Sequence, residues 1–162
     1  GIWRNMGGCL APMNAYLNII GMETLGLRME RVCNNAFRLA QALEKLEGVS
    51  VNYPLLESSP YHELAEKQLS GKGGAILTIR AGSKERAYKL INHLKYVKIA
   101  TNIGDVRTLV IHPASTIYIH STPEAMEEAG VYDDTIRISV GIEDIKDLIQ
   151  DFTEAVESLG EE

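Results

Sequence analysis

Apolar positions recur along this chain with the spacing of helices at both ends and of short strands in the middle. From Leu25 to Leu46 they alternate at intervals of four and three residues, which predicts a helix of about six turns that ends before Gly48. The same interval fits a coiled coil, but systematic charge pairs beside the stripe are missing, which favours a helix facing the core. A shorter helix is predicted from Pro12 to Glu23, because proline in a first turn costs no hydrogen bond. A final stripe, from Ile145 to Leu159, follows acidic residues that the helix dipole favours.

Strand signals occupy the middle of the chain. Short apolar and partly β-branched runs predict strands, and the caps and stripes between them predict further helices. The expected strands are 75–79, 97–100, 108–111 and 135–140, the expected helices are 62–69, 83–94 and 123–129, and 53–74 is otherwise an extended connection. These elements predict an α+β fold with a small sheet covered by helices on one side. We expect residues 1–162 to form a single domain, because the length fits about one domain and no repeat or linker interrupts it.

Composition and charge exclude several classes of partner. Apolar residues make up 45% of the chain, enough for a buried core, and two cysteines are too few for a disulfide framework. The net charge of −6 argues against nucleic acid, whose binding depends on clustered lysine and arginine. The least charged stretch, 5–22, contains a proline, asparagines and glycines that are unfavourable in a membrane span. No secretion signal opens the chain, so we expect a cytoplasmic protein without nucleic-acid or membrane partners.

Several motifs have simple structural interpretations. The Ser-Gly-Lys-Gly-Gly segment 70–74 is similar to a phosphate loop but precedes a strand and not a helix, which favours a turn. The four histidines lie in different predicted elements without the spacing of a zinc site, so no metal is expected. The acidic residues between Glu124 and Asp134 are expected on a solvated face. Cys33, beside the apolar stripe, is expected to be packed and inert, and no nucleophile motif is present.

Arg137 is the strongest candidate for a binding residue. In the predicted strand 135–140 the two isoleucines and the valine share one face, while Thr135, Arg137 and Ser139 share the other. An arginine on a rigid strand beside small hydroxyl residues can offer its planar fork to a carboxylate through two charge-assisted hydrogen bonds. The alternative interpretation of a lone arginine in this position is a surface ion pair.

Five motifs, taken together, resemble a known enzyme family. They are Pro12–Leu17, Gly21–Met29, Asn102–Asp105, Thr108–Thr116 and Arg137–Glu143. In this order and at these spacings they are similar to the C-terminal third of the cystathionine-synthase-like, pyridoxal-phosphate-dependent enzymes of Cys/Met metabolism. The Asn-Ile-Gly-Asp motif and the segment Asn52–Pro60 most resemble the O-acetylhomoserine sulfhydrylase branch of that family.

The resemblance implies the small C-terminal domain of an aspartate-aminotransferase-like, fold type I subunit, with a mainly antiparallel sheet and a long N-terminal helix. It implies that Arg137 binds the α-carboxylate of a small amino-acid substrate and that Asn102 steadies the carboxylate and the arginine. It further implies that His112 and Pro113 shape that side of the pocket. The full-length protein would be a homo-oligomer, a tetramer, in which a missing N-terminal large domain holds pyridoxal 5′-phosphate.

The chain also departs from the family pattern. Ile117-Tyr118 stands where relatives commonly have Thr-His, and Val32 stands where His is frequent. None of the eight lysines matches a cofactor-lysine motif, so we expect no cofactor bound to this chain and no catalysis from it alone.

Several functions stay open at this point. For the full-length enzyme the resemblance implies formation of homocysteine from O-acetylhomoserine and sulfide. Methionine γ-lyase and cystathionine γ-synthase are the alternatives within the family. A free-standing α+β module that binds an amino acid or a partner is the alternative from another class, and Arg137 would be its carboxylate anchor without cofactor chemistry.

Overall fold

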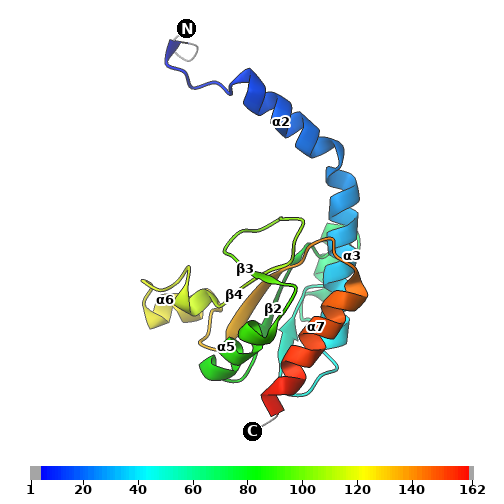
Figure 1. Ribbon diagram of the computed structural model, residues 1–162, viewed down its shortest axis with the longest axis vertical. Helices are drawn as coiled ribbons and strands as arrows, with labels where there is room; N and C mark the ends of the chain where they lie inside the picture. The colour runs from blue at the N-terminus through cyan, green and yellow to red at the C-terminus, as the bar shows by residue number, and fades with distance from the viewer. Residues whose placement is uncertain (1–4, 161–162) are drawn as a thin grey trace.

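The structure, a computed structural model, describes residues 5–160 and has the α+β fold that the sequence predicts (Figure 1). Its α-helices are α2 (Pro12–Glu23), α3 (Leu25–Leu43), α4 (His62–Leu69), α5 (Lys84–His93), α6 (Pro123–Glu128) and α7 (Ile145–Glu157). Its strands are β1 (Ser50–Asn52), β2 (Ile76–Arg80), β3 (Lys98–Ile99), β4 (Leu109–Ile111) and β5 (Thr135–Ser139). Two 3-10 helices, η1 (Pro113–Ser115) and η2 (Ser158–Gly160), complete the elements of the described part.

The strands form one sheet in the order β1-β2-β5-β4-β3. β5 lies in the centre and is antiparallel to both β2 and β4, while β3 runs parallel to β4. The sheet is therefore mainly antiparallel, as expected. Arg137 on β5 stands between Thr78 on β2 and Ile111 on β4, so the neighbouring strands hold its backbone on both sides.

Helices α3, α5 and α7 cover one face of this sheet (Figure 1). Ile136 and Ile138 of β5 are fully buried against them, together with Leu148 and Phe152 of α7. Burying one such side chain contributes roughly 1.5–3 kcal/mol. The opposite face of the strand carries the polar side chains of Thr135, Arg137 and Ser139, of which Thr135 and Ser139 are also buried.

Local caps explain where the helices start. The Ser83 hydroxyl accepts a hydrogen bond from the Arg86 N–H at 3.2 Å and begins α5, which confirms the predicted cap. Asp144 begins α7 in the same way, since its carboxylate accepts from the Lys146 N–H at 2.8 Å. Its charge also lies at the end of the helix where the dipole favours an anion.

Beyond shifts of one or two residues, two features differ from the prediction. α3 ends at Leu43, and the chain reaches Leu46 in single turns before Gly48 adopts a left-handed backbone with φ of 87°. β1 occupies residues for which no strand was predicted. With three residues at the edge of the sheet, β1 is too short to show an alternating pattern.

Helix α2 and the first turns of α3 extend away from the sheet (Figure 1). The long stripe faces the core only from Val32 onward, because Leu25 and Met29 are each 42% exposed. No residue of α2 is buried, and Tyr16 and Leu17 are each 58% exposed. Neither α2 nor any other helix within residues 5–160 is long and apolar enough to cross a membrane.

We expect the 162-residue chain to self-associate through α2. An apolar helix surface of this kind usually finds a partner. Size-exclusion chromatography with light scattering should show species larger than a monomer, and Leu17→Glu with Ile20→Glu on the exposed side of α2 should shift them toward monomer. The control is Asn14→Glu with Asn18→Glu, which adds the same two charges at exposed polar positions of that helix. A wild-type chain that is monodisperse and monomeric would contradict this expectation.

Candidate functional site

The side chain of Arg137 lies on the face of β5 opposite the helices. Ile136 and Ile138 beside it are 0% exposed, whereas Arg137 is only partly buried. This is the arrangement that the alternating pattern of the strand predicts. Because β5 is the central strand, Arg137 is a positively charged group on a rigid support.

The guanidinium of Arg137 is only partly used by the protein itself. Its Nη2 donates to the carbonyl of Thr101 at 2.7 Å and lies 3.5 Å from the carbonyl of Asn102. Its Nε is buried and has no hydrogen-bond partner within residues 5–160. Since an unsatisfied buried donor costs free energy, an acceptor at this atom would be stabilising. The surface ion pair of the alternative interpretation is not among the contacts of this side chain in the described part of the chain.

Asn102 lies in the loop 100–108, which connects β3 to β4. Its side chain is exposed, and its contact with Arg137 is made by its backbone carbonyl. The structure therefore brings Asn102 next to Arg137 through a main-chain atom, and the role of the Asn102 side chain stays a prediction. The stronger contact, from Thr101, was not predicted. A backbone carbonyl leaves no signal in the sequence, because every residue carries one.

His112 and Pro113 lie at the end of β4, where the chain enters η1. The His112 ring is 3% exposed, with Nε2 2.6 Å from the carbonyl of Asp133 and Nδ1 2.9 Å from the hydroxyl of Ser115. Its ring also meets that of Tyr88 edge to face, with 4.9 Å between centroids. Both ring nitrogens are thus occupied. His112 anchors the loop that Pro113 begins and presents no free nitrogen for proton transfer.

The glycine-rich segment 70–74 forms a turn, as the sequence favoured. Gly71 and Gly74 have left-handed φ values of 72° and 82°. Gly73 packs on the ring of Tyr53, whose Oη would lie 2.6 Å from a Cβ at that position. Burial raises the pKa of the Tyr53 phenol, and the nearby Cys33 thiol adds to this, so its neutral hydroxyl donates to the Gly74 carbonyl at 2.9 Å. The segment is therefore occupied by the protein's own side chain and does not form a phosphate cradle.

The acidic run after η1 is only partly solvated, which corrects the expectation for Asp134. Glu124, Glu127 and Asp133 are exposed, whereas Asp134 is 7% exposed. Its carboxylate accepts from Arg80 Nε at 2.8 Å and from the Gly82 N–H at 3.1 Å. Asp134 precedes β5 directly, and it ties the start of that strand to the end of β2. Sequence gave no sign of this pairing because Arg80 lies 54 residues away.

Few groups in the described residues are suitable for binding a metal ion or for forming a covalent bond with a cofactor. Within residues 5–160 no cluster of three or more His, Cys, Asp or Glu side chains could hold a metal ion. All eight lysines of the chain are exposed. A Schiff base with pyridoxal phosphate requires an amine enclosed beside the cofactor, and the described chain by itself encloses none of these lysines. The site around Arg137 fits a carboxylate, and no cofactor contact is assigned to this chain.

Comparison with known proteins identifies the family of this chain. The family model described as Cys/Met metabolism PLP-dependent enzyme matches residues 2–157. The chain is 46% identical over 156 residues to homocysteine synthase of Schizosaccharomyces pombe, which covers 95% of this chain and 36% of that protein. It is 40% identical over 154 residues to an L-methionine gamma-lyase of Fusobacterium nucleatum subsp. polymorphum, covering 94% of this chain and 39% of the relative.

A solved structure shows the same fold. A putative O-acetylhomoserine (thiol)-lyase from Campylobacter jejuni, which carries a pyridoxyl-lysine monophosphate, matches with a TM-score of 0.88 at 37% identity. The match covers 95% of this chain and 37% of that one. The chain thus spans less than half the length of the relatives that it matches. On the strength of the family model and of these relatives, the chain belongs to the pyridoxal-phosphate-dependent enzymes of Cys/Met metabolism.

Proposed function

We propose that this chain is the substrate-side, C-terminal domain of a longer enzyme that makes homocysteine from O-acetylhomoserine and sulfide, releasing acetate. In this proposal Arg137 binds the α-carboxylate of the substrate. The observation that carries the proposal is the partly used guanidinium, with a buried Nε that has no partner in the described chain. The pyridoxal phosphate that defines the family supplies the electron-withdrawing group for this chemistry when it is bound in the full-length enzyme.

The geometry of Arg137 supports a carboxylate over a neutral ligand. In a guanidinium, Nε–H and one N–H of Nη2 lie on the same edge and match the two oxygens of a carboxylate. In this chain Nη2 has only neutral carbonyl partners and Nε has none within residues 5–160. Within residues 5–160 no carboxylate therefore forms an ion pair with Arg137, and a substrate carboxylate would supply an anion.

Asn102, His112 and Pro113 have supporting roles in this proposal. The main chain at Thr101 and Asn102 orients the guanidinium from one side. His112 holds the start of η1 through its two ring nitrogens, and Pro113 begins that turn. These residues shape the rim of the carboxylate site, and none of them is proposed to transfer a proton.

The choice of substrate has a second candidate. The names of the S. pombe and C. jejuni relatives favour homocysteine formation. The similarity to an L-methionine gamma-lyase supports γ-elimination from methionine as the alternative. Both reactions place an amino-acid α-carboxylate on Arg137, so the site itself does not separate them.

The test is to supply the purified full-length enzyme with O-acetylhomoserine and sulfide, and separately with methionine alone. We expect homocysteine and acetate in equal amounts from the first mixture. Methanethiol and 2-oxobutanoate from the second mixture, at a higher kcat/KM, would favour the lyase. No turnover of either substrate would contradict both forms of the proposal.

The surroundings of this domain are also part of the proposal. We place the cofactor lysine in the part of the enzyme outside this chain and expect a homo-oligomeric, tetrameric enzyme. The exposed apolar surface of α2 supports such contacts. Cys9 and Cys33 are both free thiols, which supports a reducing, cytoplasmic setting.

A further inference from the structure

The loop 100–108 is held along its length by β5 and by the turn that follows this strand. At its start, the Thr101 carbonyl accepts from Arg137 at 2.7 Å. In its middle, the Gly104 N–H donates to the hydroxyl of Ser139 at 3.3 Å. At its end, Thr108 bonds to Glu143. Residues of one continuous segment, 137–143, therefore hold the loop that orients the arginine.

The contact between Glu143 and Thr108 is the strongest of these attachments. The Thr108 N–H donates to one carboxylate oxygen of Glu143 at 2.5 Å, and the Thr108 hydroxyl donates to the other at 2.9 Å. The same hydroxyl accepts from the Gly141 N–H at 3.0 Å. Thr108 is fully buried. Bonds to an ionised acceptor are stronger than neutral ones, so Glu143 fixes this residue from two sides.

The turn that carries Glu143 is itself immobilised. The Asn35 amide of α3 donates to the carbonyls of Gly141 and Glu143 at 3.0 and 2.9 Å, and Asn35 is fully buried. The Ile142 N–H donates to the Val106 carbonyl at 2.9 Å. A Cβ on Gly141 would lie 2.4 Å from that same carbonyl oxygen. The turn and the end of the loop are thus packed directly against each other.

We propose that Glu143 is a positioning residue for substrate binding. It holds the loop 100–108 in the register that places the carbonyls of Thr101 and Asn102 against the guanidinium of Arg137, and it acts on the substrate only through that arginine. This inference rests on the proposed function of Arg137. Without the Glu143 carboxylate, the Thr108 end of the loop loses two bonds, and the guanidinium loses its fixed orientation toward a carboxylate.

The test is a double-mutant cycle in the full-length holoenzyme, with O-acetylhomoserine varied at saturating sulfide. Glu143→Ala should raise KM about tenfold, with kcat within about threefold of wild type and an unchanged cofactor absorbance spectrum. Glu143→Gln, which keeps one oxygen for the Thr108 N–H, should restore part of the loss. In an Arg137→Lys background Glu143→Ala should add less than about threefold, because the fork on which it acts is already missing.

Matched variants separate positioning from a general loss of structure. Thr108→Val should reproduce the increase in KM, and Thr108→Ser, which keeps the hydroxyl, should stay within about twofold of wild type. Glu157→Gln removes a charge at an exposed position of α7 and should also stay within about twofold. If Glu143→Ala does not fold, Glu143→Gln replaces it in the double-mutant cycle with Arg137→Lys. We then expect a smaller increase in KM.

The results distinguish failure of the positioning role of Glu143 from failure of the proposed function of Arg137. Additive effects of Glu143 and Arg137, or a fall in kcat with unchanged KM, would overturn the positioning role. If Arg137→Lys raises KM and the Glu143 variants do not, the inference fails and the proposed function stands. If Arg137→Lys itself leaves both KM and kcat/KM unchanged, the proposed function fails and the inference fails with it.

Discussion

Replacing Arg137 by lysine in the full-length enzyme should lower kcat/KM for the amino-acid substrate by about tenfold or more, and Arg137→Ala should lower it by about a hundredfold or more. Lysine keeps the positive charge but loses the planar fork, so one of two parallel hydrogen bonds to the carboxylate is lost. Alanine removes both bonds and the charge. The measurement is steady-state kinetics of the two variants beside wild type.

The absorbance spectrum of the bound cofactor is the internal control for this prediction. No cofactor contact is assigned to Arg137, so both variants should bind pyridoxal phosphate as wild type does. Arg107→Ala is a matched control, because Arg107 is an exposed arginine in the loop 100–108. We expect its kcat/KM to stay within about twofold of wild type. Wild-type kcat/KM in Arg137→Ala would show that the carboxylate is bound elsewhere and that Arg137 has only a structural role.

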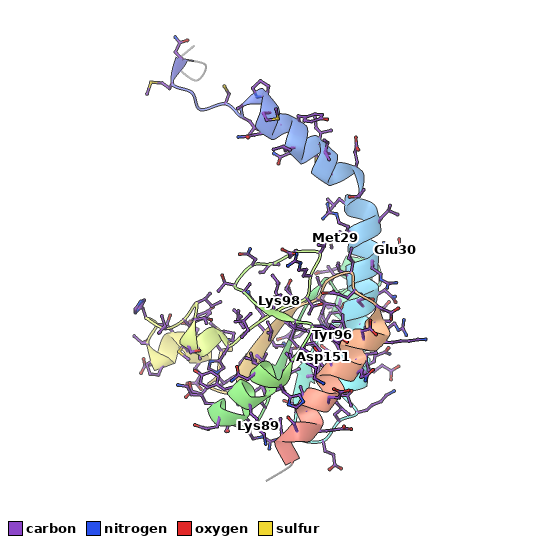
Figure 2. All side chains as sticks on the ribbon, in the orientation of Figure 1. Met29, Glu30, Lys89, Tyr96, Lys98 and Asp151 are labelled. Atoms are coloured by element: carbon purple, nitrogen blue, oxygen red, sulfur yellow. The ribbon has the colours of Figure 1, made fainter. Side chains whose placement is uncertain are left out.

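Asp151→Ala should destabilise the chain by about 3 kcal/mol. Asp151 on α7 is 2% exposed, and its two oxygens accept the backbone N–H groups of Lys95 and Tyr96 at 2.9 and 3.1 Å. Figure 2 shows Asp151 and Tyr96 side by side where the chain passes from α5 to β3. Alanine would leave two backbone donors without their charged acceptor, and such donors are costly to leave unpaired.

The free energy of unfolding can be measured by urea denaturation of the 162-residue chain, followed by circular dichroism. Asp151→Asn keeps one acceptor oxygen and should cost about half as much as Asp151→Ala. Asp147→Ala, an exposed aspartate one turn earlier on α7, should change stability by less than about 1 kcal/mol. Equal midpoints for Asp151→Ala and Asp147→Ala would contradict a structural role for the buried carboxylate.

The local pattern of the sequence determined most of the elements and the side on which Arg137 lies. Helix stripes and strand alternation report burial over a few residues, and neighbouring residues must satisfy both the backbone geometry and the core. For this reason the spacing of Ile136 and Ile138 by itself predicts that Arg137 lies on the face away from the helices. The caps at Ser83 and Asp144 are local in the same sense, since donor and acceptor lie within three residues.

The motifs carried a different kind of information. Their order and spacing identified the family, and the comparisons confirm that identification. They did not indicate how the residues of the site contact one another. The resemblance implied that Asn102 steadies Arg137, and the structure has that contact through the main chain of Thr101 and Asn102. The identity of the residue at position 102 does not show whether its side chain or its backbone contacts Arg137.

Only the tertiary structure decided which distant groups meet. β1 is a strand because β2 lies beside it, and Asp134 is buried because Arg80 and Gly82 reach it from the end of β2. In the sequence, Glu143 is only an acidic residue between a predicted strand and a predicted helix. In the structure, its carboxylate accepts hydrogen bonds from Thr108, which lies 35 residues away. Such contacts depend on the order of strands in the sheet, and strand order is set by the packing of the whole core, which no short stretch of sequence contains.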